Sequence, residues 1–347
     1  MKEIKIGNNL IGDGHKPFLI LEIAQSHDGS LGIAHSYIDA AAAAGADAVK
    51  FQTHIANEES TLDEPFRTKF SYQDATRFEY WKRMEFTEEQ WIGLKQHADD
   101  KGLIFLSSGF SYKAIELLDR IGVPAFKLGS GEFKSFDLVN AICATNKPIL
   151  YSTGMSTITE IDSFYNSMLV KKYPIAIFQC TSKYPTQPCD IGLNVITDFK
   201  NRYSCPVGLS DHSGKIFAPI LSLPLGTNII EVHLTFHKKI FGPDTSSSLT
   251  IDECMMLRQA IDDYHEMIKS PFDKDKIAKQ LEQAREIFTK SISTIRDIQV
   301  GEILSKNMIK PKKPGTGIPF DQLDYYLGRK FIKNVEANRI INLNDLE

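Results

Sequence analysis

The sequence predicts an α/β protein, a (βα)8 barrel followed by a small β-rich domain. Eight short apolar runs alternate with longer segments of helical period, as in repeated βα units with buried parallel strands. The 347-residue chain is also about 100 residues longer than a barrel of this kind needs. No Gly-rich dinucleotide fingerprint or Walker motif follows the first run, which disfavours a doubly wound sheet. The runs cover residues 18–25, 47–54, 103–110, 123–130, 148–155, 173–180, 205–212 and 227–234.

The segments between the runs have the periodicity of helices, and several end in Gly directly before the next run, as helix C-caps do. Ahead of the first run, the sequence IKIGNNLIGDGHKPF predicts a short hairpin around Gly12-Asp13-Gly14. We expect this hairpin to cap the N-terminal end of the barrel.

Beyond the last helical segment the composition changes. Residues 271–290 are polar and charged, which indicates a linker after a barrel domain of residues 1–270. Turn signals at Gly301, Pro314-Gly315 and Gly328 indicate a β-rich module over residues 291–347.

Composition excludes several classes of protein. With 42% hydrophobic and 24% charged residues, the chain has the composition of a globular protein. Its net charge of -4 disfavours nucleic-acid binding, which depends on an excess of positive charge. Five cysteines without CxxC spacing indicate neither a disulfide framework nor a zinc knuckle, so we expect a reducing compartment. The N-terminus lacks the apolar region of a signal peptide, and no stretch approaches 18 apolar residues. We therefore expect a cytoplasmic protein without membrane contact.

Every run ends in polar side chains, and in a (βα)8 barrel these ends meet at one rim, where active sites lie. A single polar rim residue is more often only hydrogen-bonded there, but a ring of lysines, glutamates and histidines indicates ligands. Lys50 and Lys127 suit an anion that carries phosphate and carboxylate groups. The hydroxyls expected beside them are Ser108, Ser130, Ser152 and Thr153.

Two histidines, His212 and His233, end neighbouring strands and could approach one divalent ion, although hydrogen bonding to the rim is the alternative. The carboxylates at the rim are candidates for general bases, for hydroxyl binding and for orienting other groups. The residues alone do not apportion these roles among Glu22, Glu132, Glu231 and Asp244.

Two other functions compete with this interpretation. A lysine in a barrel strand also fits a Schiff-base aldolase, because a desolvated lysine is nucleophilic near neutral pH. A barrel that binds a sugar without turnover is the non-enzyme alternative. The presence of Glu22, both lysines and both histidines disfavours it.

At these residues the sequence resembles the N-acetylneuraminate (sialic acid) synthase family, which condenses phosphoenolpyruvate with an N-acyl hexosamine. The resemblance covers nearly the whole chain, and its motifs occur in the family's order. They are EIAQSHDGSL (22–31), AGADAVKFQTH (44–54), FKLGSGE (126–132), STGM (152–155), QCTSKYPT (179–186), GLSDHS (208–213), GPD (242–244) and KPGTGI (313–318). The resemblance implies a (βα)8 barrel with a C-terminal antifreeze-like (SAF) domain, which matches the large and small domains expected above.

The resemblance also implies roles for individual residues. Phosphoenolpyruvate is expected on Lys50, Ser108, Lys127, Ser130, Ser152, Ser182 and Ser210. The sugar is expected beside Gln52, Glu132, Tyr184 and Lys313. His212 and His233 would bind Mn2+ or Mg2+. Glu22, Glu231 and Asp244 are the expected catalytic carboxylates, with Glu22 orienting or activating water. The KPGTGI turn would reach the partner's site in a domain-swapped homodimer.

The sequence departs from the family pattern at four places. Lys313 stands where Arg usually precedes Pro-Gly, and Thr245-Ser246 follow GPD where His-Lys is common. Ser182 replaces a familiar Asn, and Gly109 a familiar Pro. Because Lys313 and Thr245 lie on the expected sugar side, the acceptor is the open question. N-acetylmannosamine, giving N-acetylneuraminate, is the first choice, and a 2,4-diacetamido hexose, giving legionaminate or pseudaminate, is the alternative.

The segment of residues 56–87 is long for a βα loop. A small satellite core is the ordinary role for its aromatic residues, and a lid or dimer contact is the alternative hypothesis. These residues are Phe66, Phe70, Tyr72, Phe78, Tyr80 and Trp81.

Overall fold

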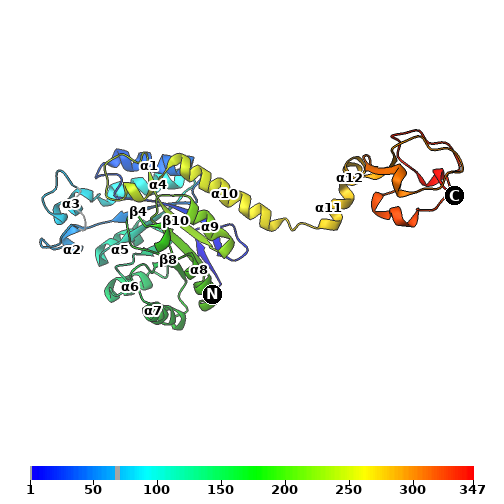
Figure 1. The fold of residues 1–347 in the computed structure, drawn as a ribbon. Coiled ribbons are helices and arrows are strands. Elements are labelled where there is room, and N and C mark those ends of the chain that lie inside the picture. The colour runs from blue at the N-terminus through cyan, green and yellow to red at the C-terminus, as the bar shows by residue number, and fades with distance from the viewer. Residues whose placement is uncertain (1, 67–70) are drawn as a thin grey trace. The chain divides into compact units, whose positions relative to one another are not determined.

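Parallel strands form a closed barrel in the computed structural model, which describes residues 2–66 and 71–347 (Figure 1). Within these residues eight strands, β3 to β10, pair in chain order, and β10 closes the ring by pairing with both β9 and β3. The strands are β3 (Phe18–Ala24), β4 (Ala48–Thr53), β5 (Ile104–Gly109), β6 (Phe126–Leu128), β7 (Ile149–Ser152), β8 (Ile175–Cys180), β9 (Val207–Asp211) and β10 (Ile229–Thr235). The predicted fold class is confirmed, since each predicted run contains or overlaps one strand.

One further strand, β11 (Ser248–Thr250), was not predicted. It pairs with β10 from His233 to Thr235, beyond the point at which β9 ends its pairing at Val232. The chain segment that contains GPD thereby folds back against the end of β10.

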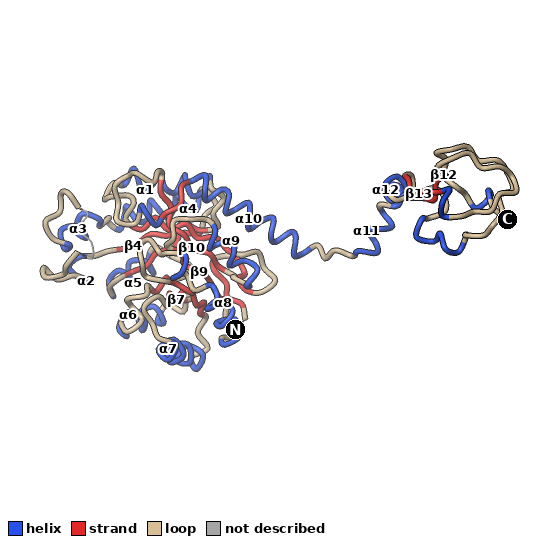
Figure 2. Tube along the Cα trace, viewed as in Figure 1, coloured by secondary structure: helices blue, strands red, loops and turns tan. Residues whose placement is uncertain are grey.

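Helices surround the ring of strands (Figure 2). The α-helices of this unit are α1 (Leu31–Ala43), α2 (Ala56–Glu59), α3 (Arg77–Met84), α4 (Glu88–Asp100), α5 (Tyr112–Arg120), α6 (Phe136–Ala144), α7 (Ile158–Val170), α8 (Leu193–Arg202), α9 (Phe217–Ser222) and α10 (Ile251–Lys269). Short 3-10 helices add η1 (Pro188–Asp190), η2 (Leu223–Leu225) and η3 (Thr245–Ser247).

Local sequence sets where these helices begin and end. Thr87 and Thr157 form capping boxes at the N-termini of α4 and α7, which satisfy backbone N–H groups that have no partner inside the helix. Gly45, Gly102 and Gly122 follow α1, α4 and α5 with φ of +76°, +74° and +83°. Glycine adopts this left-handed conformation without a Cβ clash, so the predicted glycine C-caps are present.

The barrel has two apolar layers because strand side chains alternate in direction. Outward-facing residues such as Val49, Phe51 and Phe105 pack with helix residues such as Trp91 in the larger core. Inward-facing residues form a smaller core, and they include Ile20, Ala48, Leu106, Ala125, Leu150, Ala176, Phe178 and Ile229. The inner core fills the N-terminal part of the barrel and leaves the polar residues at the other end.

The N-terminal hairpin has a different turn from the predicted one. Strands β1 (Glu3–Ile6) and β2 (Asn9–Gly12) turn at Gly7-Asn8, and Gly12-Asp13-Gly14 follows the hairpin. Gly7 has φ +56°, a conformation that suits a two-residue hairpin loop. The hairpin's isoleucines, Ile4, Ile6 and Ile11, belong to the inner core, so the hairpin closes the N-terminal end of the barrel.

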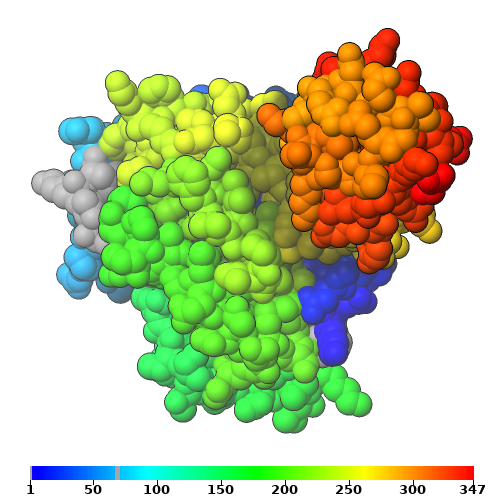
Figure 3. Space-filling model, turned by 45° about the vertical axis from the view of Figure 1, so that its right-hand side comes forward, coloured from blue at the N-terminus to red at the C-terminus, as the bar shows by residue number. Residues whose placement is uncertain are grey.

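The chain divides into two compact units, Met1–Lys269 and Ser270–Glu347. The space-filling view shows the second unit in orange to red (Figure 3). Its elements are α11 (Lys274–Gln280), α12 (Glu282–Phe288), β12 (Ser291–Thr294), η4 (Lys306–Met308), β13 (Ile309–Lys312), η5 (Phe320–Tyr325) and η6 (Leu343–Asp345). The expected linker therefore contains two short helices, and its boundaries stay a prediction.

The second unit has its own core, built around Ile292, Ile309, Phe331 and Ile341. Strands β12 and β13 pair antiparallel, and isolated bridges such as Ile298 with Val335 extend the β structure. Among the described residues, none of the helices in either unit is long and apolar enough to cross a membrane.

Candidate active site

A cavity of about 580 Å³ lies at the C-terminal ends of the barrel strands. The site residues predicted from the sequence line it, except Thr153, Asp244 and Lys313. The Thr153 hydroxyl instead donates a hydrogen bond to the Phe178 backbone oxygen. The predicted residues that line the cavity are Glu22, Lys50, Gln52, Ser108, Lys127, Ser130, Glu132, Ser152, Ser182, Tyr184, Ser210, His212, Glu231 and His233. The structure thus brings these residues together, while their individual roles stay predictions.

Asp244 lines a second cavity of about 330 Å³, which we call the smaller chamber. The two cavities share four lining residues, Gln52, Arg77, Tyr184 and His233. Lys313 belongs to the second unit, where its Nζ lies 5.1 Å from the centre of the Phe288 ring.

Strand alternation decides which polar side chains face the cavity. Ser108 and Ser210 face it, whereas their neighbours Ser107 and Asp211 do not line it. Ser107 Oγ donates a hydrogen bond to the backbone oxygen of Phe51, and Asp211 accepts one from Ser213. These two side chains therefore make hydrogen bonds within the barrel wall and do not contribute to the cavity lining.

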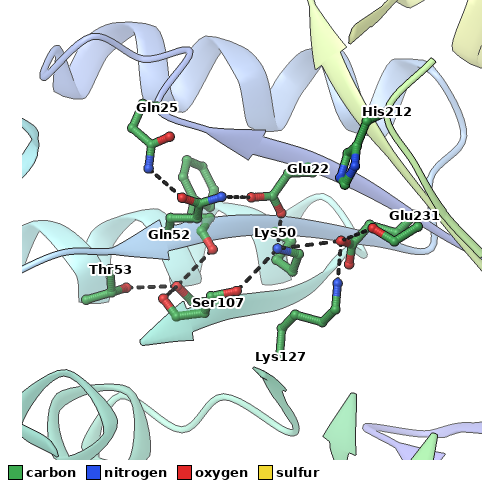
Figure 4. Close-up of polar contacts among 12 residues, drawn as sticks. Glu22, Gln25, Lys50, Gln52, Thr53, Ser107, Lys127, His212 and Glu231 are labelled. Carbon is green, nitrogen blue, oxygen red and sulfur yellow. Dashed lines mark hydrogen bonds and ion pairs between the residues drawn. The ribbon is translucent and has the colours of Figure 1, made fainter. Parts of the chain in front are cut away.

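Two lysines and two glutamates form a buried charge centre on the cavity floor (Figure 4). Lys50 Nζ pairs with Glu22 and lies 3.8 Å from Glu231 Oε1, while Lys127 Nζ lies 2.5 Å from the same oxygen. No more than 4% of any of these four residues is exposed. Buried charges are stable only when paired, and here the two signs balance. A ligand anion can therefore bind by taking the place of a carboxylate beside a lysine.

Burial and pairing shift these groups in different directions. Burial, reinforced by the nearby Glu231 charge, raises the pKa of Glu22 to about 7 despite its contact with Lys50. Burial also opposes ionisation of Glu231, but Lys127 and Lys50 lower its pKa to about 2. Burial lowers the pKa of Lys127. Glu22 is consequently the carboxylate poised to exchange a proton near neutral pH.

Hydroxyl groups lie around the charge centre. Lys50 donates to Ser108 Oγ at 3.4 Å, and Ser210 Oγ donates to Glu231 at 3.1 Å. Ser130 Oγ accepts a hydrogen bond from the backbone N–H of Gly154. Ser152 Oγ is buried without a hydrogen-bond partner in the described part of the chain. A buried hydroxyl in this state is ready to bind a polar ligand.

The two histidines face each other across the cavity wall. Their ring centres lie 5.4 Å apart, and the His212 ring also stacks on Tyr184 at 4.2 Å. His212 Nδ1 lies 3.0 Å from the Thr181 backbone oxygen, while His233 Nδ1 is buried without a partner among the described residues. Burial, together with the His212 charge, holds the pKa of His233 well below its usual range.

These features fit a metal ion only in part. The unpartnered nitrogen of the neutral His233 ring is the kind of group a metal would satisfy. Burial opposes the charge of His212, but Cys180 and the Thr181 backbone raise its pKa to about 9, which favours the cationic form over a ligand. Moreover, no cluster of three or more His, Cys, Asp or Glu residues in the described ranges could hold a metal ion. Substrate or water would have to complete the coordination.

Several lining residues were not predicted as site residues. Arg77 of α3 lines both cavities, and Gln25, just beyond β3, lines the smaller chamber. Phe110 and Cys180 line the larger cavity. Arg77 comes from the long 56–87 segment, so its position depends on how that segment folds over the rim.

The 56–87 segment itself forms a small separate core. Ala56, Tyr80, Trp81 and Met84 are buried together, with Phe66 and Phe78 packed against them. This confirms the satellite core. Phe70 lies outside the described residues, and the lid or dimer contact stays a prediction.

A (βα)8 barrel with a buried lysine–glutamate centre at its C-terminal rim has the architecture of the large class of barrels that carry their active sites at this end. Comparison with known protein families identifies the family within this class. The chain matches the NeuB family over residues 37–272 and the SAF domain over residues 289–347. The chain belongs to the NeuB family, and the resemblance found in the sequence is confirmed.

Individual relatives span the whole chain. An uncharacterised protein of Methanocaldococcus jannaschii is 33% identical over 100% of this chain and 99% of its own length. The N,N'-diacetyllegionaminic acid synthase of Campylobacter jejuni is 31% identical over 94% of this chain and 99% of its own. A crystal structure of N-acetylneuraminic acid synthetase from Leptospira borgpetersenii, in complex with citrate, has a TM-score of 0.70 and 27% identity, and covers 82% of this chain and 96% of that one.

Proposed function

We propose that this protein is a nonulosonic acid synthase that condenses phosphoenolpyruvate with an N-acyl hexosamine and releases phosphate. The observation that carries the proposal is the buried Lys50–Glu22 and Lys127–Glu231 arrangement at a (βα)8 rim in a member of the NeuB family. N-acetylmannosamine is the preferred acceptor, which would give N-acetylneuraminate. A 2,4-diacetamido hexose is the alternative, since the relatives include a legionaminic acid synthase.

The charges and hydroxyls suit the first substrate. Phosphoenolpyruvate carries a phosphate and a carboxylate, and Lys50 and Lys127 would each neutralise part of this charge. Ser152, whose Oγ has no partner in the described chain, and Ser130, Ser182 and Ser210 would donate hydrogen bonds to its oxygens. Anion binding would separate the lysines from the glutamates and free Glu22 for catalysis.

In the proposed reaction C3 of phosphoenolpyruvate adds to the aldehyde carbon of the open-chain sugar, and the aldehyde oxygen takes up a proton. Water then adds at C2, and the tetrahedral intermediate loses phosphate as the C2–O bond breaks. Glu22 would accept the water proton, for which a pKa near 7 is well matched. Before the anion binds, Glu231 would hold both lysines in place. Asp244, Glu132, Gln52 and Tyr184 would bind the sugar.

His212 and His233 are the residues that would hold Mn2+ or Mg2+. When bound, such an ion supplies Lewis-acid polarisation of a carbonyl oxygen. The family resemblance also supports a domain-swapped homodimer in which Lys313 reaches the partner's site. The cytoplasm is the proposed location, because five cysteines without CxxC spacing suit a reducing compartment.

A panel of acceptor sugars tests the proposal. The full-length protein, phosphoenolpyruvate and Mn2+ are incubated with each N-acyl hexosamine, and phosphate release and product mass are read. We expect phosphate to be released only when an acceptor is present. The product should have the mass of the sugar plus phosphoenolpyruvate and water, minus the phosphate released. Lys127→Met should lower kcat/KM for phosphoenolpyruvate at least about a hundredfold. Lys134→Met, which removes an exposed lysine paired with Glu160, is the matched control.

The lowered pKa of Lys127 keeps the Schiff-base aldolase as a second candidate, because a neutral lysine is the nucleophile in that chemistry. Borohydride distinguishes the two reactions, because it reduces and traps the imine that only the aldolase forms. Trapping of pyruvate on Lys127, with no phosphate released from phosphoenolpyruvate, would replace the condensation with the aldolase.

A further inference from the structure

A buried chain of hydrogen bonds connects helix α2 to Glu22. His54 Nδ1 lies 2.6 Å from Glu59 Oε1, and His54 Nε2 lies 2.7 Å from Gln25 Nε2. Gln25 Nε2 also donates to Gln52 Oε1 at 2.6 Å, and Gln52 Nε2 donates to Glu22 Oε1 at 3.0 Å. Figure 4 shows the inner part of this chain, from Gln25 through Gln52 to Glu22.

The His54 ring is also held sterically. It stacks between Trp81, at 3.9 Å and 15°, and Phe110, at 4.6 Å and 4°. Only 4% of the His54 side chain and 7% of the Glu59 side chain are exposed. Stacking fixes the plane of the ring but leaves open which nitrogen carries the proton.

The two carboxylates at the ends decide the direction of every bond between them. Ionised carboxylates only accept hydrogen bonds, so Glu22 needs the Gln52 amide N–H and Glu59 needs an N–H on His54 Nδ1. His54 Nε2 is then an acceptor, which requires the Gln25 amide nitrogen to face it. Reversing Gln25 or Gln52 would place two oxygens against each other. With both carboxylates ionised, one arrangement therefore satisfies the whole chain.

This arrangement defines what the smaller chamber offers to a ligand. Both hydrogens of the Gln25 amide are used, so Gln25 can offer a ligand only its carbonyl oxygen. Gln52 uses one hydrogen and one lone pair of its oxygen, so the donor that it can offer is its second N–H. Both residues line the smaller chamber.

We propose that Glu59 and His54 are positioning residues that fix the amide orientations of Gln25 and Gln52 and, through Gln52, the Glu22 carboxylate. Neither residue lines either cavity. The kinetic part of the proposal rests on the proposed function, because it assigns Glu22 to catalysis and the smaller chamber to the acceptor sugar.

The test combines spectroscopy with kinetics on the full-length protein labelled with 15N-histidine. His54→Phe, which keeps the stacked ring, assigns the His54 signals. We expect wild-type His54 to carry its proton on Nδ1. Glu59→Gln should shift the ring toward the other tautomer, because the new amide can donate to Nδ1. It should also lower kcat about tenfold and raise KM for the acceptor, with KM for phosphoenolpyruvate within about twofold.

Glu58→Gln is the matched control. Glu58 lies on the same helix but pairs with Lys113 at the surface, so both signals and kinetics should match the wild type. Wild-type His54 protonated on Nε2, or full kcat in Glu59→Gln or His54→Phe, would overturn the proposal. If the wild-type protein turns over none of the acceptors, the proposed function is wrong but the hydrogen-bond network is still open to test. The ring signals and the amide orientations in a crystal structure of Glu59→Gln test the network without turnover.

Discussion

At the scale of single residues, His27 is a histidine that the fold keeps neutral. Only 1% of it is exposed, its ring packs 4.8 Å from Phe86, and its Nδ1 accepts a hydrogen bond from the Gly29 N–H. Burial, with the nearby Arg83 charge, lowers the pKa of His27 to about 3. An exposed histidine in the unfolded chain titrates near 6.5.

His27 should therefore make stability depend on pH. Between pH 6.5 and 3 the unfolded chain binds one more proton at this site, so the free energy of unfolding falls as the pH falls through this range. The site contributes at most about 1.4 kcal/mol per pH unit. His27→Asn keeps an acceptor for Gly29, and its unfolding free energy, measured in urea from pH 7 to 5, should fall less steeply. An identical slope in both proteins would contradict the assignment.

The histidine pair gives a second prediction at this scale. His212→Ala and His233→Ala should each abolish stimulation by Mn2+ while the circular dichroism spectrum stays unchanged, because each removes one proposed ligand. His237→Ala, an exposed histidine just beyond β10, should respond to Mn2+ as the wild type does. Full metal stimulation in either pair variant would refute a metal role for that residue.

The strand residues of the site were predictable from the sequence. Alternation along β4 and the family motifs together indicated Lys50 and Gln52, and both line the cavity. The motifs also indicated loop residues such as Tyr184. Gln25, in a loop, and Arg77, at the start of α3, follow neither rule, because contacts that form only after the chain folds place their side chains.

At the scale of elements, a polar tie anchors α3 to the loop after β3. Arg83 of α3 donates to Asp74 with Nε and Nη2 and to Asp28 with Nη1. Gly29 packs against the Arg83 backbone, and a Cβ at this position would lie 2.4 Å from the Arg83 backbone oxygen, so a larger residue would clash. The tie fixes the helix that carries Arg77 and Trp81.

Arg83→Met should loosen this part of the 56–87 segment. It leaves the carboxylate of Asp74, whose side chain is 6% exposed, without its cation, which costs about 1–2 kcal/mol of unfolding free energy. Limited proteolysis should then cut the segment earlier than in the wild type. Lys82→Met removes an exposed pair with Glu85 on the same helix and should change neither measurement. Equal cleavage rates in all three proteins would show that the tie does not hold the segment.

The predicted and observed elements differ where local sequence has two solutions. Gly12-Asp13-Gly14 looks like a turn, yet the hairpin turns at Gly7-Asn8, since that register buries Ile4, Ile6 and Ile11 under the barrel. The short strand β11 was missed because it has only three residues, which pair with the C-terminal end of β10.

At the scale of the whole molecule, each unit has its own core, and the proposed homodimer makes Lys313 complete the partner's site. Co-expression of Glu22→Gln and Lys313→Ala chains with different tags tests this. Each chain alone should be inactive. Purified mixed dimers should recover about half of the wild-type rate, because one of their two sites is intact. Inactive mixed dimers, or an active Lys313→Ala protein, would contradict the exchange.

The fold of the first unit was predictable because its repeated βα pattern is strongly periodic, and eight strands leave one closed arrangement. The acceptor sugar was not predictable. The smaller chamber, proposed as its site, is lined by residues from separated segments, such as Gln25, Arg77, Tyr184 and Asp244, whose joint geometry no single motif encodes.

The central claim is that the protein joins phosphoenolpyruvate to a sugar and releases phosphate by breaking the C2–O bond. Phosphoenolpyruvate labelled with 18O at the bridging oxygen tests it directly, with the mass of the released phosphate as the readout. The account predicts that the phosphate carries the label and that its release requires an N-acyl hexosamine. Unlabelled phosphate, or release that is independent of the sugar, would contradict it.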